Sequence, residues 1–480
     1  MAGVFLAALD QTVILTAIPE MLQDVHVSLT QLDDASWIVT GYLLGYVSIL
    51  PLAGRMSDVH GRRPIFLAAL AVFLAGSIAS AEARSLWWLV AARVCQAVGG
   101  GALLPLTFAL AADELPPAKR PFWLGAVGAA AEAGGVLGPL YGAAIVEHLG
   151  WRWVFWINVP LAAAVAIGLG LTLGAAKRRA EGIDYLGAAL FATALAALTV
   201  GLSGSSDPTR SASPIQLQRA IPLTVVALIA GALFVWRQRR AAAPLAPLSL
   251  FRRRPFSAAN AANALVGVAL IAAMVDVPLF AATVLGRSPV DAGLALLRMT
   301  VLIPIGALAG GWLAARLRWD GIAVAGLLVS AAGFLLMSRW GIDVSDAAMT
   351  PDLALAGLGF GLVIAPITSA VLAAVGDADR ALSTALVTVM RMVGMTVGLA
   401  ALTSVAFYRF NQLVQGLSLP LAASGESAAA FGQRVAAYQA GVTHAALEVF
   451  TGVFFIAACI CLASCLLAFG LGKRGQAAGY

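Results

Sequence analysis

Four ionisable residues lie inside long apolar segments of the sequence, where charge is costly. They are Asp10, Arg93, Glu132 and Arg391. A charged side chain at the centre of a bilayer costs about 2.5–3.5 kcal/mol on insertion scales, so each one needs a partner or a task. A static buried ion pair is the alternative for any one of them alone. As a set, two acids and two arginines favour a functional role.

The chemistry that such a set can perform is reversible proton binding. Burial favours the protonated form of a carboxylate, whereas an arginine within about 4–6 Å favours the ionised form. A rearrangement that brings or removes the arginine therefore changes the proton affinity. A membrane potential adds about 2.3 kcal/mol per charge per 100 mV and can bias such a cycle. We hypothesise that Asp10 and Glu132 are the protonatable groups, with Arg93 and Arg391 as their electrostatic partners.

Further polar residues in apolar segments are candidates for the wall of a central cavity. They are Asp276, Arg298, Asn260 and Asn263. No pattern indicates a metal, a cofactor or an enzyme, because the four cysteines lie in apolar segments without ligand spacing and no nucleophile–base pair is visible. We therefore expect a protein that is not an enzyme, binds no metal or cofactor, and is driven by a proton gradient.

The composition identifies the elements that must position these residues. The sequence is 61% hydrophobic and 11% charged, with a mean hydropathy of +0.90, which predicts an all-α membrane protein. We predict fourteen transmembrane helices, each near or above the ~20 residues that a bilayer requires. The predicted spans are 1–22, 35–54, 64–81, 86–112, 120–147, 152–176, 184–202, 220–236, 257–285, 291–316, 320–338, 352–375, 381–417 and 440–472.

The basic residues predict the orientation of these spans. With the N-terminus in the cytoplasm, about nineteen lysines and arginines fall in inside loops and about eight in outside loops. We therefore expect a multi-pass protein of the bacterial cytoplasmic membrane with both termini cytoplasmic. The net charge of +6 follows from this topology, and no nucleic-acid partner is needed.

Residues 54–64, GRMSDVHGRRP, join two predicted spans by a tight turn, which we call the latch. Its candidate gate residues are Gly54, Asp58, Gly61, Arg62 and Arg63. The glycines stand where close helix approach or a positive φ would exclude a side chain. We expect the aspartate to accept a hydrogen bond from a helix N-terminus or to pair with an arginine, and the arginines to bridge to the other half. A positively charged loop with incidental glycines is the alternative.

The long polar connection in the middle of the chain predicts the domain boundaries. We expect a six-helix bundle at 1–176, a linker with an inserted two-helix hairpin and a basic cytoplasmic loop at 177–256, and a second six-helix bundle at 257–480. The basic loop could bind anionic lipid headgroups, but a topological anchor is the preferred interpretation.

The latch resembles the signature loop between helices 2 and 3 of the major facilitator superfamily, which gates the inner face during alternating access. Residues 9–12, LDQT, and Arg93 with Gln96, Gly99 and Gly100 are similar to motifs of its fourteen-helix drug:proton antiporter branch. EAGGVLGPLYG at 132–142 resembles the antiporter motif of helix 5, which implies a role in bending and close packing for Gly134, Gly135, Gly138, Pro139 and Gly142.

A closer resemblance is to the mycobacterial triacylglyceride exporters that work with a periplasmic lipid-carrying lipoprotein. It rests on five segments: SWIVTGYLLGY at 36–46, LGPLYG at 137–142, VFWINVP at 154–160, VDVPLF at 275–280 and YRFNQLVQGLS at 408–418. The resemblance implies functional roles for Asp10, Glu132 and Arg391. Arg298 and the short outer loop at 339–351 depart from the family pattern, which puts the lipid and the lipoprotein partner in doubt.

Two predicted helices are longer than a bilayer requires. A continuous helix at 381–417 would be about 55 Å long, against a hydrocarbon core of about 30 Å. The segment 431–448 reads as helical but too polar for lipid. Together they would form an extracytoplasmic helical extension that guides a molecule unable to enter water. Tilted helices with an amphipathic surface segment are an equal alternative.

The combined prediction is a monomeric, proton-coupled exporter of triacylglyceride-like lipids or lipophilic drugs, in contact with membrane lipids. A general multidrug:proton antiporter without a lipid role is the first alternative. A polar-solute symporter would need a hydrophilic cavity, whereas the predicted midplane is mostly Ala, Leu, Val and Gly. A membrane scaffold or sensor would not require the latch, the charges and the glycine-rich helices together.

Overall fold

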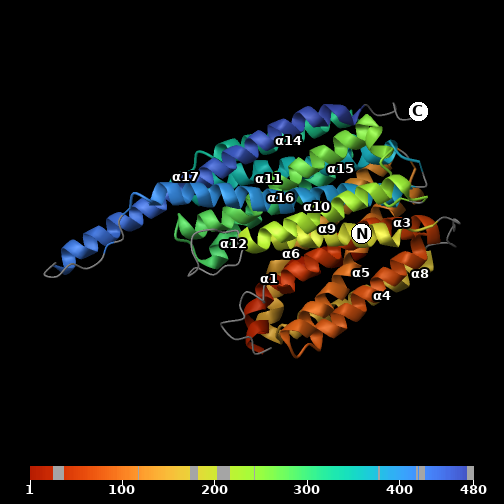
Figure 1. Cartoon of the computed structure of the whole chain (residues 1–480), viewed down its shortest axis with the longest axis horizontal. Coiled ribbons are helices and arrows are strands. Elements are labelled where there is room, and N and C mark those ends of the chain that lie inside the picture. Colours follow the sequence, from red (N-terminus) through yellow and green to blue (C-terminus); the bar gives the residue numbers. More distant parts are fainter. Residues whose placement is uncertain are drawn as a thin grey trace.

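The computed structural model describes residues 1–24, 37–116, 118–172, 182–202, 217–242, 244–376, 379–417, 420 and 427–472. Every regular element in these ranges is helical (Figure 1). This agrees with the predicted all-α class, because intrahelical bonds satisfy the backbone of an apolar chain.

The first group of helices runs from the N-terminus through the latch. Its members are α1 (Ala2–Asp24), α3 (Trp37–His60), α4 (Arg62–Ala81), α5 (Leu86–Glu114), α6 (Arg120–Leu149), α7 (Arg152–Trp156) and α8 (Asn158–Thr172). Within the group, α1 packs on α6, and α5 packs on both α3 and α4. The latch is mostly helical rather than a turn: residues 54–60 end α3, residues 62–64 begin α4, and Gly61 alone forms the break between them.

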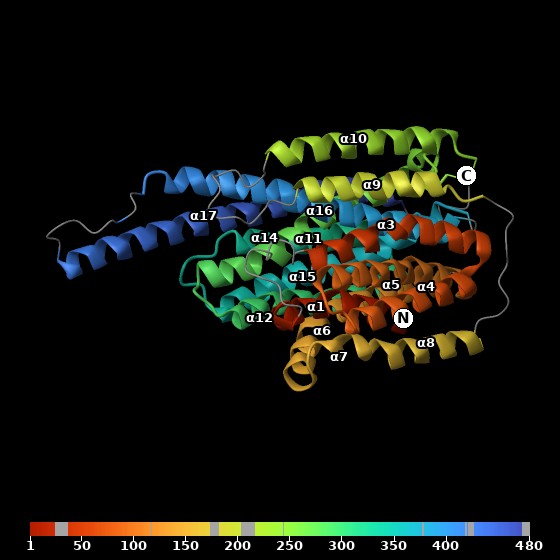
Figure 2. The ribbon, with the colours of Figure 1, turned by 60° about the horizontal axis from the view of Figure 1, so that its bottom comes forward.

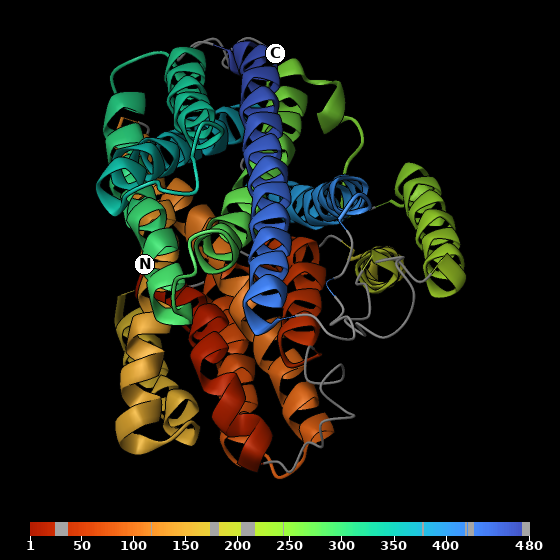
Figure 3. The same ribbon diagram turned by 90° about the vertical axis from the view of Figure 1, so that its left-hand side faces the viewer.

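Two further helices, α9 (Tyr185–Leu202) and α10 (Leu217–Arg240), pack on each other as a pair. Helix α9 also contacts α3, and α10 lies outside α9 at the periphery (Figures 2 and 3). Residues 177–181, 203–216 and 243 of the predicted linker lie outside the described residues. The boundaries at 176 and 256 stay predictions.

The last group follows the short helix η2 (Leu250–Arg252). Its members are α11 (Arg254–Thr283), α12 (Pro289–Thr300), α13 (Leu302–Ala314), α14 (Trp319–Met337), α15 (Asp346–Ala373), α16 (Arg380–Val414), α17 (Ala428–Ala468) and η4 (Phe469–Leu471). Here α11 packs on α16 and α17, while α15 packs on α13 and α14. Contacts of α6 with α13 and of α3 with α16 join this group to the first.

Within the described ranges, eleven helices are long and apolar enough to cross a membrane, and two shorter apolar helices lie at Ala2–Ile14 and Tyr185–Gly201. The prediction of fourteen spans is not confirmed by this count. Helix α1 itself continues past Ile14 to Asp24.

Helices α16 and α17 are the longest, with 35 and 41 residues. At 1.5 Å per residue they measure about 52 and 61 Å, well beyond the ~30 Å of a hydrocarbon core. Helix α17 extends past the other helices in two views (Figures 1 and 2). We call the outer part of α16 and α17 the extension, from Tyr408 to Leu417 and from Ala428 to Glu448.

Candidate functional site

The carboxylate of Asp10 lies at the centre of a buried hydrogen-bond network in the first group of helices. Arg93 Nη1 on α5 donates to Asp10 Oδ2 over 2.8 Å, and the side chains of both residues are 0% exposed. Gln96 Nε2 and Asn158 Nδ2 each donate to Asp10 Oδ1 over 2.8 Å. One acid therefore accepts hydrogen bonds from α5 and α8 while belonging to α1.

The arginine of this network is held on several sides. Its Nη1 also donates to Gln96 Oε1 over 2.8 Å, and its guanidinium lies 4.0 Å from the ring centroid of Tyr42 and 5.6 Å from that of Phe155. Aromatic faces stabilise such a cation. Asn158 continues the network to Ser77 Oγ over 3.0 Å, and Ser77 donates to the Phe155 carbonyl over 2.9 Å.

The second acid, Glu132 on α6, pairs with an arginine of the other group of helices. Arg391 Nη1 on α16 donates to Glu132 Oε1 over 2.9 Å, and the side chains are 18% and 20% exposed respectively. Both residues lie about 16–18 Å from the start of their helices, near the middle of a ~30 Å core. This ion pair joins the two groups at midplane depth.

Glu132 and Arg391 line a cavity of about 10 Å³, at the lower limit of the space that one water needs. Asn263 lines it, donating through Nδ2 to the Val387 carbonyl over 2.7 Å. The remaining wall is apolar: Val266, Leu270, Ile303, Phe360, Val363 and Ile364. The expected pairings of Asp10 with Arg93 and of Glu132 with Arg391 are thus both present, and their role in proton coupling stays a prediction.

The latch aspartate contacts both kinds of partner expected from the sequence. Asp58 pairs with Arg62, and Asp58 Oδ2 accepts a hydrogen bond from Leu382 N over 3.2 Å. Leu382 lies in the first turn of α16, where free backbone N–H groups favour an anion. The carboxylate therefore holds the start of a helix from the other group.

Both latch glycines are required by the geometry. A Cβ on Gly54 would come within about 3 Å of the Ala381 carbonyl and the Leu382 backbone, so a larger residue would separate α3 from α16. Gly61 has a φ of 95°, which L-residues rarely adopt. The sequence pattern predicted these two constraints.

The latch arginines divide between the two groups of helices. Arg55 bridges to Asp379 over 3.5 Å, whereas Arg63 donates to the Gly170 carbonyl of α8 over 2.8 Å, within the first group. Asp113, at the end of α5, was missed by sequence reasoning. It accepts from Arg62 over 3.0 Å and from Arg380 of the other group over 2.8 Å.

The glycines of the 132–142 segment lie at different surfaces. A Cβ on Gly134 or Gly138 would press on α1, near the Phe5 and Leu9 carbonyls respectively, whereas Gly135 has open space. Gly142 is buried, and the side chain of Pro139 lies outside the described residues. Two of these glycines therefore permit the close contact of α6 with α1, the helix that carries Asp10.

The remaining candidates are dispersed. Asn260 is buried and donates to the Phe256 carbonyl over 2.8 Å. Asp276 is half-buried and has no hydrogen bond or ion pair to any described residue. Arg298 does not line the central cavity: it pairs over 3.2 Å with Asp346, which begins α15 on the side opposite the latch.

Sequence reasoning also missed Asn158, Ser77 and Tyr42, which support the Asp10 network. The only available signal was polar groups within apolar segments, which alone does not identify partners. In the described part of the chain, no three His, Cys, Asp or Glu side chains are grouped to hold a metal ion.

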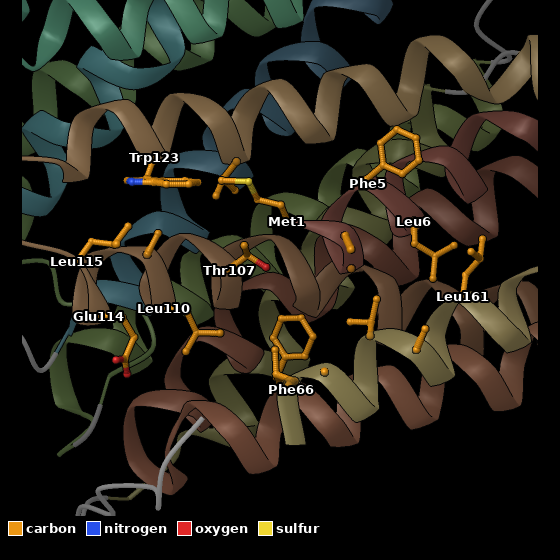
Figure 4. A pocket seen from close by; sticks show the side chains of 18 residues that line it. Met1, Phe5, Leu6, Phe66, Thr107, Leu110, Glu114, Leu115, Trp123 and Leu161 are labelled. Atoms are coloured by element: carbon orange, nitrogen blue, oxygen red, sulfur yellow. The ribbon is translucent and has the colours of Figure 1, made fainter. Parts of the chain in front are cut away.

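A larger apolar groove, of about 780 Å³, lies on the first group of helices (Figure 4). Leu6, Phe66, Thr107, Trp123 and Leu161 are among the residues that line it, from α1, α4, α5, α6 and α8. It contains none of the four paired charges.

Comparison with known proteins gives one family. The sequence profile of the Major Facilitator Superfamily matches residues 1–399. A triacylglyceride transporter of Mycolicibacterium smegmatis is 39% identical over 481 residues, covering 97% of this chain and 85% of the relative. A triacylglyceride transporter of Mycobacterium tuberculosis is 39% identical over 494 residues, covering 99% and 93%.

Two solved structures show the same fold at low identity. The human organic anion transporter MFSD10 has a TM-score of 0.61 at 19% identity, covering 96% of this chain and 97% of that chain. The fucose:proton symporter of E. coli has a TM-score of 0.57 at 15% identity, covering 96% and 97%. At these identities the likeness concerns the fold alone.

Proposed function

Because the chain belongs to the Major Facilitator Superfamily and is therefore a transporter rather than an enzyme, we propose that it exports triacylglyceride-like lipids in exchange for protons. The export proceeds across the bacterial cytoplasmic membrane by alternating access. Its relatives' names support the lipid, and the family supports secondary transport. The latch side is the cytoplasmic side in this proposal.

The observation that carries the proposal is the Glu132–Arg391 pair across the two groups of helices, with Asp58 holding the start of α16 at the latch. In this arrangement the cytoplasmic side is closed. A proton that neutralises Glu132 removes the attraction to Arg391, so the two groups separate more easily at midplane depth. Opening is thereby linked to proton uptake.

Asp10 has a different part in this cycle, because all of its partners lie within the first group of helices. Arg93 is seven residues from the start of α5, about 10 Å, and 21 residues from its latch-side end, about 31 Å. The Asp10 network thus lies toward the side opposite the latch. We propose that it receives the proton from the outside before Glu132 does.

The lipid class is supported by the wall of the central cavity and by the extension. The wall carries one ion pair and one amide among aliphatic and aromatic side chains. The extension continues on the side opposite the latch, where a released lipid would have to leave without entering water. A lipid-carrying lipoprotein is the proposed acceptor there, and the transporter is proposed to act as a monomer.

The proposal includes fourteen spans, as in the drug:proton antiporter branch. Among the residues that the structure describes, eleven helices satisfy length and composition, and the proposed remainder are α1, α6 and α9. An even number of spans is consistent with both termini on the cytoplasmic side.

The test is reconstitution into liposomes with an imposed pH gradient. A fluorescent triacylglyceride, a cationic dye and a sugar are offered to the wild type and to Glu132→Gln. We expect gradient-driven movement of the glyceride by the wild type and none by the variant. Movement of the dye without the glyceride would support the multidrug alternative, and movement of the sugar alone would refute the lipid proposal.

A further inference from the structure

A second pocket, of about 540 Å³, lies at the foot of the extension, apart from the central cavity. Ser338, Arg339 and Trp340 after α14 form one wall, and Leu413 of α16 and Leu417 just after this helix form another. Helix α17 closes it with residues 441–451. We call it the foot pocket.

The foot pocket lies at the membrane boundary on the side opposite the latch. Helices α6 and α13 meet where α6 begins and α13 ends, at Pro121 and Gly311, on the latch side. Helix α14 therefore begins on the latch side, and its end at Met337 lies on the other. The residues that line the pocket begin directly after Met337 and include Trp340. Tryptophan is enriched at membrane–water interfaces, which fits this position.

The charges of the foot pocket are unbalanced. Arg339 is exposed, and its guanidinium makes no hydrogen bond or ion pair with any residue in the described ranges. His444 is likewise exposed without such a partner. The one acid of the wall, Glu448, is already paired with Arg409 over 2.8 Å. An unpaired guanidinium beside a neutralised acid attracts an anion, and its fork of donors fits phosphate oxygens.

The rest of the wall fits a chain attached to that anion. Leu413, Leu417, Leu447 and Ala445 supply an apolar surface next to the charged rim. Gly441 lets the Leu417 side chain pack close against α17, because a Cβ there would meet that side chain at 2.9 Å. A free phosphate would use the rim alone, whereas a phospholipid would use both parts.

We propose that the foot pocket binds the phosphate headgroup of an anionic phospholipid, with Arg339 as the anchor and the leucines against the first part of an acyl chain. The lipid comes from the leaflet opposite the latch, which is the outer leaflet in the proposed orientation. The site does not depend on which molecule is transported. Its test is therefore independent of the proposal of triacylglyceride export.

The test is equilibrium binding of a fluorescent dioleoyl phosphatidylglycerol to the purified full-length protein in detergent. Arg339→Gln should weaken binding about fivefold, since a basic residue near a lipid surface contributes that much, and Arg339→Lys should retain most of it. Arg84→Gln is the matched control, because Arg84 is also an exposed arginine without a described partner, in the loop after α4 on the same side. It should leave binding unchanged.

A second variant tests the apolar part. Gly441→Leu places a side chain where that of Leu417 now lies, so it pushes Leu417 toward the pocket without changing charge. It should also weaken binding while the elution volume stays that of the wild type. Competition separates the sources of phosphate: unlabelled phosphatidylglycerol should displace the probe, and inorganic phosphate at millimolar concentration should not. Equal binding by Arg339→Gln and wild type, equal displacement by phosphatidylcholine, or displacement by inorganic phosphate would each overturn the proposal.

Discussion

Asp10→Asn should destabilise the protein strongly, because it leaves Arg93 buried without a counterion. The substitution keeps the shape of the side chain but replaces one acceptor oxygen by a donor. All three partners donate to this carboxylate: Arg93 to one oxygen, Gln96 and Asn158 to the other. Wherever the new amide nitrogen lies, it faces at least one donor. A flip of the Gln96 amide would not solve this, because Gln96 Oε1 would then no longer accept the hydrogen bond from Arg93.

The magnitude follows from burial. Breaking a buried ion pair by removing one partner costs about 3–5 kcal/mol, and both side chains are 0% exposed. An unfolding entropy of about 2.1 cal/mol/K per residue gives about 1 kcal/mol/K for 480 residues. The melting temperature in detergent should therefore fall by about 3–5 °C.

Differential scanning fluorimetry on intrinsic tryptophan fluorescence measures this shift. Asp346→Asn is the control, because its carboxylate is 52% exposed and its loss should cost no more than about 1 kcal/mol. The double variant Asp10→Asn with Arg93→Gln should be less destabilised than the sum of the singles, since it removes the isolated charge. A melting temperature within 1 °C of the wild type for Asp10→Asn, or strict additivity in the double variant, would refute the reasoning.

Three further predictions concern transport and the latch. Glu132→Gln should abolish gradient-driven transport in liposomes but lower the melting temperature by only about 1–2 °C, because its pair is 18–20% exposed; a shift as large as that of Asp10→Asn would contradict this. Gly54→Leu should separate α3 from α16 and raise labelling of a cysteine placed at Asp379, and unchanged labelling would count against a closed latch. Arg55→Asp should impair transport, and adding Asp379→Arg should restore most of it; failure of the second change to rescue would show that this 3.5 Å pair is not a gate contact.

The pairing of the four central charges could be predicted from the sequence because the physical constraint is severe. An ionised group in an apolar segment is stabilised by an opposite charge, and the four strongest candidates are two acids and two arginines. Which acid meets which arginine depends on packing, and Asp276 in α11 has no partner among the described residues. The constraints at the latch could also be predicted from the sequence. Gly54 allows a close approach of two helices and Gly61 a positive φ, and few other residues allow either. In both cases residue type alone restricts the solutions.

The supporting residues could not be predicted because their partners depend on how helices pack. The side chains of Asn158 and Ser77 are of a kind that can form hydrogen bonds within their own helix. Because α8 packs beside α1 and α4, Asn158 instead donates to Asp10 and to Ser77. Asp113 looked like an ordinary charge at the end of a span. Arg298 does lie within the apolar run Asp291–Ala314, and only the packing of α12 against α15 shows that its side chain reaches Asp346 rather than the central cavity.

The two ion pairs differ in whether both partners belong to the same group of helices. This difference decides which pair changes when the transporter opens or closes. Every partner of Asp10 moves with the first group of helices, so rigid-body motion of the two groups leaves its surroundings unchanged. The partner of Glu132 belongs to the other group, and the same motion must lengthen their 2.9 Å contact. A carboxylate whose counterion leaves couples its proton affinity to opening, whereas Asp10 can receive a proton and pass it on without responding to this motion. The cross-bundle pair is therefore the one whose loss should uncouple transport, and the buried pair is the one whose loss should first weaken the fold.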